Sequence, residues 1–123
     1  MIIAIDFDGT CVTHEYPRVG KDIGAVSVLK KLVENGHKLI LFTMRSQNAY
    51  IEDAIKWFND NEIPLYGVNT NPSQFRWTSS PKVLADLYID DAGLGMPLCY
   101  THVELPYVDW IEVEKMLKSK ALL

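Results

Sequence analysis

The chain has 123 residues, of which 48% are hydrophobic and 23% are charged, with a formal net charge of −4. This length fits a single domain over residues 1–123 with a sizeable core. The acidic balance argues against nucleic acid or an anionic membrane as a partner, and no apolar run approaches the ~20 residues of a membrane span. We see no signal-peptide pattern and no disulfide framework, so we expect a cytoplasmic protein.

The chain opens with a short apolar run, residues 2–5, that ends in two carboxylates, Asp6 and Asp8. An uninterrupted, β-branched run of this kind predicts a strand that is buried on both faces. Because strand side chains alternate, Asp6 and Asp8 should leave the strand on one side and Phe7 on the other. Gly9 then allows a sharp turn. Keeping two carboxylates charged at the end of a buried strand costs free energy unless a cation or hydrogen-bond donors accompany them.

Two helices and two further strands are predicted next. After an irregular loop, the first helix should begin near Asp22, whose carboxylate can cap it, and end at Asn35-Gly36. The apolar run over residues 38–42 predicts the second strand, and Ser46 is a candidate N-cap for the second helix. Residues 65–68 are expected to form a short third strand.

The second half of the chain carries weaker patterns. Residues 69–80 are polar, and Ser80-Pro81 predicts one helical turn over residues 82–85. Residues 87–89 predict the fourth strand, which again ends in two acids. A glycine- and proline-bearing loop should follow, and Asp109 is expected to begin the last helix.

This alternation of strands and helices predicts an α/β fold, a three-layer Rossmann-like parallel sheet with helices on both faces. Right-handed crossovers place the carboxyl ends of parallel strands at one edge of the sheet, where open α/β sheets bind ligands. We therefore expect the polar residues that follow the strands to meet in one crevice: Asp6, Asp8, Thr43, Asp90 and Asp91.

Carboxylates that converge on one spot repel each other and require a hard cation. A set of oxygen ligands without histidine or thiolate suits Mg²⁺. The hydroxyl of Thr43 and the ammonium of Lys82 would suit a phosphate-like anion. One carboxylate can attack phosphorus to form an aspartyl-phosphate, and a second can protonate the leaving oxygen and then activate water.

Four stretches of the chain carry a family resemblance: Asp6-Phe7-Asp8-Gly9-Thr10, Leu41-Phe42-Thr43, Lys82 and Ile89-Asp90-Asp91. In this order they resemble the four signature motifs of the haloacid dehalogenase-like superfamily, which consists mostly of Mg²⁺-dependent phosphatases. The first is similar to its DxDGT motif, and together the four stretches span residues 1 to about 95. The chain is therefore expected to be an enzyme, a hydrolase of phosphate monoesters.

The resemblance implies a role for each of these residues. Asp6 would be the nucleophile and Asp8 the general acid and base, while Thr43 and Lys82 would hold the phosphoryl group. Mg²⁺ would bind Asp6, the backbone carbonyl of Asp8 and Asp90, with Asp91 either a direct ligand or a residue behind the ligands.

The gaps between the motifs are too short for the cap domain that most members of the superfamily carry, so the chain resembles a capless member. An open site implies a macromolecular substrate, or a small one covered by a loop or by a neighbouring subunit of a homo-oligomer. Arg45 and the stretch Phe75-Arg76-Trp77 are candidates for substrate contact. For Phe75 and Trp77, packing of the long loop onto the body is the favoured interpretation.

Other interpretations stay open. A phosphotransferase would share the first half-reaction, and a receiver-like or other binding module could keep the fold. A receiver domain would need an aspartate after the third strand, where Asn69 stands. Two C-x-T-H stretches also raise the alternative of a zinc site, although chance explains such spacing more simply. The four residues of that alternative are Cys11, His14, Cys99 and His102.

Overall fold

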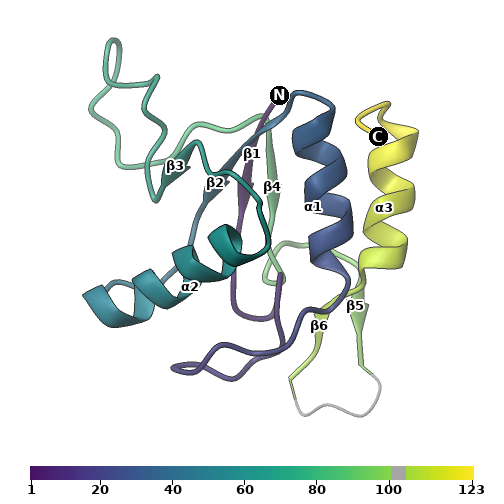
Figure 1. Ribbon diagram of the computed structural model, residues 1–123. Coiled ribbons are helices and arrows are strands. Elements are labelled where there is room, and N and C mark those ends of the chain that lie inside the picture. Colours follow the sequence, from purple (N-terminus) through teal and green to yellow (C-terminus); the bar gives the residue numbers. More distant parts are fainter. Residues whose placement is uncertain (101–104) are drawn as a thin grey trace.

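The computed structural model describes residues 1–100 and 105–123 (Figure 1). Its elements in chain order are β1 (Ile2–Ile5), α1 (Ala25–Glu34), β2 (Lys38–Leu41), α2 (Asn48–Asp60), β3 (Gly67–Val68), β4 (Leu87–Ile89), β5 (Leu98–Cys99), β6 (Tyr107–Val108) and α3 (Trp110–Ser119). Strands β1 to β4 form one parallel sheet in the order β3-β2-β1-β4, and β5 pairs with β6 in a small antiparallel ribbon. Among the described helices, none has the length and apolar character of a membrane span.

The main core lies between one face of the sheet and the three helices. Ile3 and Ile5 of β1 pair with Leu39 and Leu41 of β2, and all four side chains point to this face. Phe7 points to the same side as Ile5 and packs on α2, where its ring centroid lies 6.2 Å from that of Phe58. Each of these side chains is fully buried. The alternation predicted for the first strand is therefore present, with Phe7 in the core.

The opposite face of the sheet is covered by residues 69–86, which connect β3 at one edge to β4 at the other. Ala4 and Ile40 point to this face and are buried. The Tyr88 hydroxyl, which points the same way, donates to the carbonyl oxygen of Val83 at 2.6 Å. The predicted α/β class is thus confirmed as a Rossmann-like parallel sheet between two covering layers. Helices form one layer, and a segment without helix forms the other.

The helical turn predicted over residues 82–85 is wrong. The Gln74 side-chain amide donates to the carbonyl oxygens of Ser80 and Lys82, and its oxygen accepts from the backbone N–H of Leu84. Asn71 donates to the carbonyl oxygen of Leu84. These buried amides satisfy backbone groups that a helical turn would have to satisfy internally.

The helix starts differ from the sequence predictions in detail. The Asp22 carboxylate does accept from the backbone N–H groups of Gly24 and Ala25, but α1 begins after Gly24, which has a φ of 103°. The N-cap of α2 is Gln47, so the assignment of Ser46 is wrong. Asp109 caps α3 as predicted, because its side chain accepts from two backbone N–H groups of the first turn.

Candidate functional site

A pocket of about 530 Å³ opens where β1, β2 and β4 end. Strand β1 lies between the other two, at the point where the direction of the strand connections reverses, and open α/β sheets bind ligands at such a point. The pocket brings together all five polar residues predicted for this edge: Asp6, Asp8, Thr43, Asp90 and Asp91. Arg45 also lines it.

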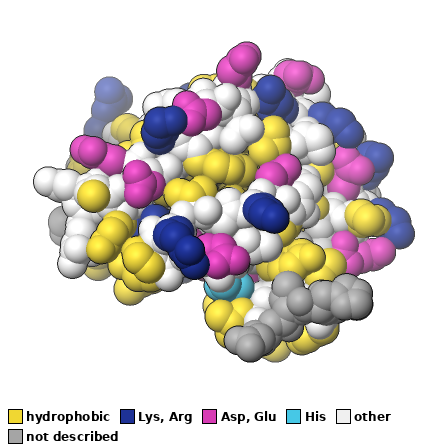
Figure 2. All heavy atoms as spheres, turned by 60° about the horizontal axis from the view of Figure 1, so that its bottom comes forward, with side chains coloured by type: hydrophobic (Ala, Val, Ile, Leu, Met, Phe, Trp, Pro, Cys, Tyr) yellow, Lys and Arg dark blue, Asp and Glu magenta, His cyan; other side chains and the backbone are white. Residues whose placement is uncertain are grey.

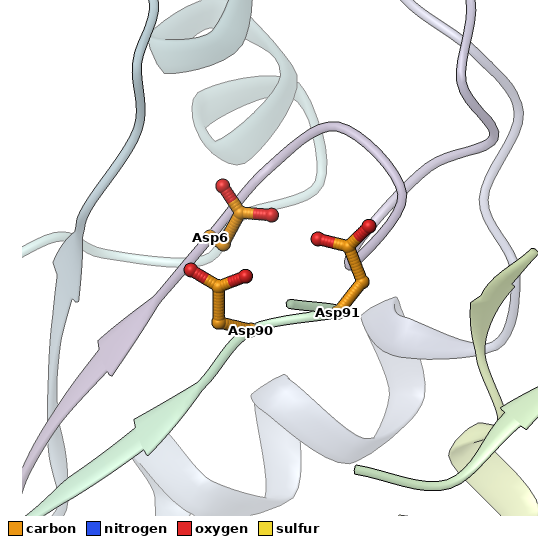
Figure 3. A group of neighbouring side chains, drawn as sticks. All are labelled: Asp6, Asp90 and Asp91. Atoms are coloured by element: carbon orange, nitrogen blue, oxygen red, sulfur yellow. The ribbon is translucent and has the colours of Figure 1, made fainter. Parts of the chain in front are cut away.

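The centre of the pocket is a group of three carboxylates, Asp6, Asp90 and Asp91 (Figure 3). One oxygen from each lies within 4.8 Å of the others. Ile5 pairs with Ile89 in the sheet, so Asp6 and Asp90 leave adjacent strands at the same level. Figure 3 shows the three side chains converging from the ends of β1 and β4.

The charges of this acidic group are poorly compensated by the protein itself. The pKa of Asp6 is raised to about 8, first by burial and then by the charges of Asp90 and Asp91, against a hydrogen bond from Thr10 that lowers it. Burial also raises the pKa of Asp90. A hard divalent cation would relieve this repulsion, and a set of carboxylate oxygens fits Mg²⁺. The residues present therefore fit the predicted metal.

Thr10 holds the acidic group together. Its buried hydroxyl donates to Oδ2 of Asp6 at 2.7 Å and accepts from the backbone N–H of Asp91 at 3.0 Å. Its carbonyl oxygen accepts from Nε1 of Trp110, which ties the motif to α3. The sequence patterns assign no separate role to Thr10, although its place in the first motif is a signal.

Gly9 and His14 approach each other closely beside Asp91. Gly9 has a φ of 78°, and a Cβ at this position would lie 2.0 Å from Nε2 of His14 and 2.8 Å from Oδ2 of Asp91. Only glycine therefore fits here. Nε2 of His14 lies 3.2 Å from Oδ2 of Asp91 and 3.1 Å from the carbonyl oxygen of Pro106. His14 thus flanks the acidic group.

The zinc alternative gains no support within the described residues, because Cys11, His14 and Cys99 do not bring their ligand atoms together there. The buried Cys11 thiol donates to the carbonyl oxygen of Asp6 at 3.3 Å, and burial raises its pKa well above the ordinary value. The fourth residue of that alternative, His102, lies outside the described residues.

Asp8 is held by Arg45 rather than by the acidic group. Both oxygens of the Asp8 carboxylate accept from the guanidinium, each at 2.8 Å. The other three guanidinium N–H groups donate to the carbonyl oxygens of Pro17, Arg18 and Tyr50. Arg45 is only 1% exposed, and its bond to Asp8 raises its pKa. All five donors of Arg45 are therefore in use. Arg45 thus clamps Asp8, and the predicted substrate contact would have to take the place of one of these bonds.

Thr43 and Lys82, the two residues expected to hold a phosphoryl group, differ in their placement. Thr43 lines the pocket, and its hydroxyl oxygen accepts from the backbone N–H of Arg45 at 3.1 Å. Lys82 is exposed and is not among the described residues that line the pocket. Its ammonium lies 5.9 Å from the ring centroid of Tyr88, which points to the same face of the sheet as Asp90 two residues later. The structure thus places Thr43 in the lining of the pocket and leaves Lys82 outside that described lining.

The aromatic residues of the long connection are exposed. Phe75 is 71% exposed and Trp77 is 67% exposed, so the interpretation that they pack onto the body is wrong. Phe75 lines a second pocket of about 350 Å³, which is formed by uncharged residues between positions 69 and 83.

No family model and no curated protein matches the chain. Among solved structures, it is similar to a conserved protein from Bacteroides thetaiotaomicron, with 37% sequence identity. The similarity covers 98% of this chain and 91% of the other, with a TM-score of 0.79. Identity and coverage at this level indicate common descent as well as a common fold. The chain therefore belongs to the same family as this conserved protein of Bacteroides thetaiotaomicron.

Proposed function

We propose that the protein is a Mg²⁺-dependent phosphomonoester hydrolase, a capless member of the haloacid dehalogenase-like superfamily that acts through an aspartyl-phosphate on Asp6. The observation that carries this proposal is the convergence of Asp6, Asp90 and Asp91 in one open pocket that also contains Asp8 and Thr43. These residues come from three of the four motif-like stretches, and they bring a nucleophile, a cation site and a hydroxyl donor together.

Asp6, Asp90 and Asp91 are the residues that would hold the cation. When bound, Mg²⁺ would favour the ionised form of Asp6 and neutralise charge on a phosphoryl group. Asp91 also contacts His14 and Thr10, so its position is fixed by the protein itself.

The chain's own residues would carry out the two half-reactions. Thr10 donates to Oδ2 of Asp6, which orients the carboxylate and leaves Oδ1 as the attacking atom. As the bond between Oδ1 and phosphorus forms, the bond between phosphorus and the ester oxygen breaks, and the leaving alcohol takes up a proton. Water then attacks the aspartyl-phosphate, which releases phosphate and restores Asp6. The Thr43 hydroxyl would donate to a phosphoryl oxygen.

Asp8 would supply the proton to the leaving group and later accept one from water. Both of its oxygens accept from Arg45, so this role requires that Asp8 exchange one of those bonds for a bond to the reacting oxygen. Arg45 would keep the second bond and hold the carboxylate in place.

The test is phosphate release from a broad panel of phosphomonoesters with Mg²⁺, Zn²⁺ or EDTA. The wild type should release phosphate with Mg²⁺, and Asp6→Asn should lower the rate roughly 10³-fold or more, because the nucleophile is lost. Asp60→Asn, an exposed aspartate at the end of α2, is the matched control and should keep the wild-type rate. Wild-type turnover by Asp6→Asn would contradict the mechanism. Transfer to an added alcohol without release of inorganic phosphate would indicate a phosphotransferase.

A further inference from the structure

The charges that line the pocket restrict what a substrate can carry besides its phosphate. Four carboxylates line the pocket, from Asp6, Asp8, Asp90 and Asp91. Among the described lining residues, Arg45 is the one lysine or arginine, and each of its N–H groups already has an acceptor. The carboxylates thus outnumber the charges of Arg45 and a divalent cation together. A second anionic group on the substrate would therefore meet more negative than positive charge among these lining side chains.

The mouth of the same pocket carries two exposed apolar side chains, Tyr16 and Met44. Tyr16 is 57% exposed and Met44 is 94% exposed. Met44 directly follows Thr43, the residue proposed to contact the phosphoryl group. Figure 2 turns the lower side of Figure 1, where the strands end, toward the viewer and shows hydrophobic side chains beside acidic ones on this face.

Tyr16 is held in place although one side of it is exposed. Its ring centroid lies 5.1 Å from the guanidinium carbon of Arg45, and its ring meets that of Tyr50 edge to face at 5.6 Å. The clamp that holds Asp8 therefore also fixes an aromatic surface at the pocket mouth. The unbranched thioether of Met44 adapts readily to the shape of a neighbouring ring.

We propose that this pocket selects phosphate monoesters of uncharged aromatic alcohols, with the ring against Tyr16 and Met44 and the phosphate at Asp6. The inference rests on the proposed phosphatase function and specifies its substrate class. Ring contacts with tyrosine and with methionine sulfur favour an aromatic group over an aliphatic chain of similar size. The excess of carboxylates disfavours sugar bisphosphates, nucleotides with several phosphates, and phosphorylated acids.

Binding of phosphonates that cannot be hydrolysed tests the inference without turnover. Phenol is a better leaving group than an aliphatic alcohol, so rates alone would favour aryl esters for chemical reasons. The dissociation constants of phenylphosphonate, propylphosphonate and 3-phosphonopropionate are measured by calorimetry with Mg²⁺ present. Phenylphosphonate should bind about 10-fold more tightly than propylphosphonate. 3-Phosphonopropionate should bind more weakly than propylphosphonate because of its carboxylate.

Variants locate the preference in the pocket. Met44→Ala should reduce the ratio of the phenyl and propyl dissociation constants to less than about 3-fold. Because Met44 is almost fully exposed, this variant should fold as the wild type does. Met116→Ala, at a 43% exposed methionine of α3, is the matched control and should keep the wild-type ratio.

Equal affinity of the wild type for the phenyl and propyl compounds would overturn the inference, as would a ratio that Met44→Ala leaves unchanged. Failure of every phosphonate to bind would overturn it as well. The phosphatase proposal is judged separately, by phosphate release in the wild type and its loss in Asp6→Asn. A phosphatase without aromatic preference is therefore distinguishable from a protein that is no phosphatase.

Discussion

Asp6 and Asp8 lie two residues apart at the end of the same strand, yet their carboxylates differ in the charges and hydrogen-bond donors around them. Burial, and after it the neighbouring acids, raise the pKa of Asp6 to about 8. Asp8 accepts two hydrogen bonds from a buried arginine. The pocket thus has an acidic half, around Asp6, Asp90 and Asp91, and a clamped half, around Asp8 and Arg45. The clamped half is neutralised within the chain, whereas the acidic half is where we propose that a divalent cation binds.

Breaking the clamped half should have the largest effect on stability. Arg45→Met would leave the Asp8 carboxylate without its partner, and three backbone carbonyl groups would lose a donor. We expect the free energy of unfolding to fall by about 3–5 kcal/mol, the usual cost of removing one member of a buried ion pair. Denaturant titration measures this change.

Arg18→Met is the matched control, because the Arg18 side chain is 84% exposed. This substitution should change the free energy of unfolding by no more than about 0.5 kcal/mol. Similar values for the two variants would show that the clamp contributes little, and the two halves of the pocket would then differ less than their geometry indicates.

The two halves also differ in how far the sequence could predict them. The acidic half follows from strand patterns and right-handed crossovers, which place strand ends at one edge without knowledge of any side-chain contact. The clamp depends on contacts between segments far apart in the chain, since Arg45 donates to Asp8, to Pro17 and Arg18, and to Tyr50. Neighbouring residues in the sequence do not reveal such partners, and the position of Arg45 just after Thr43 instead favours a substrate contact.

The conformation of residues 69–86 also depends on contacts that neighbouring residues in the sequence do not reveal. Ser80-Pro81 is a good local signal for a helix start, but Gln74 and Asn71 supply the competing hydrogen bonds from earlier in the chain. The ribbon of β5 and β6 was not predicted because each strand has two residues, too few for a periodic pattern.

Adding the cation should stabilise the acidic half. At a Mg²⁺ concentration about 100 times the dissociation constant, the free energy of unfolding should rise by about 2.7 kcal/mol. Asp90→Asn should reduce this gain, because it removes a carboxylate of the acidic half, whereas Asp60→Asn should keep it. Thermal unfolding with and without EDTA measures the effect. A full gain in Asp90→Asn would place the cation elsewhere.

Without the cation, the acidic half should make stability depend on pH. The pKa of Asp6 is raised in the folded protein from its ordinary 3.8 to about 8, so the folded state binds this proton more tightly than the unfolded state. The stability associated with Asp6 should therefore fall as pH rises through that range. Asp6→Asn lacks this titration.

In EDTA, the free energy of unfolding of Asp6→Asn should therefore rise relative to that of the wild type as the pH increases from about 5 to about 8. Asp60→Asn should show no such trend relative to the wild type. A constant difference between Asp6→Asn and the wild type would mean that Asp6 ionises in the folded protein as it does in the unfolded one.

The smallest effect concerns Thr10. Its uncharged hydroxyl donates a hydrogen bond to Asp6, as the charged guanidinium of Arg45 does to Asp8. Thr10→Val should lower the free energy of unfolding by about 1–2 kcal/mol, because the backbone N–H of Asp91 loses its acceptor. The hydrogen bond from Thr10 also lowers the pKa of Asp6, so its loss should shift Mg²⁺ binding to higher pH. Thr10→Ser keeps the hydroxyl and should restore both properties. If Thr10→Val binds Mg²⁺ with unchanged pH dependence, the hydroxyl orients Asp6 without assisting its ionisation, and the cation alone must overcome the repulsion among the three acids.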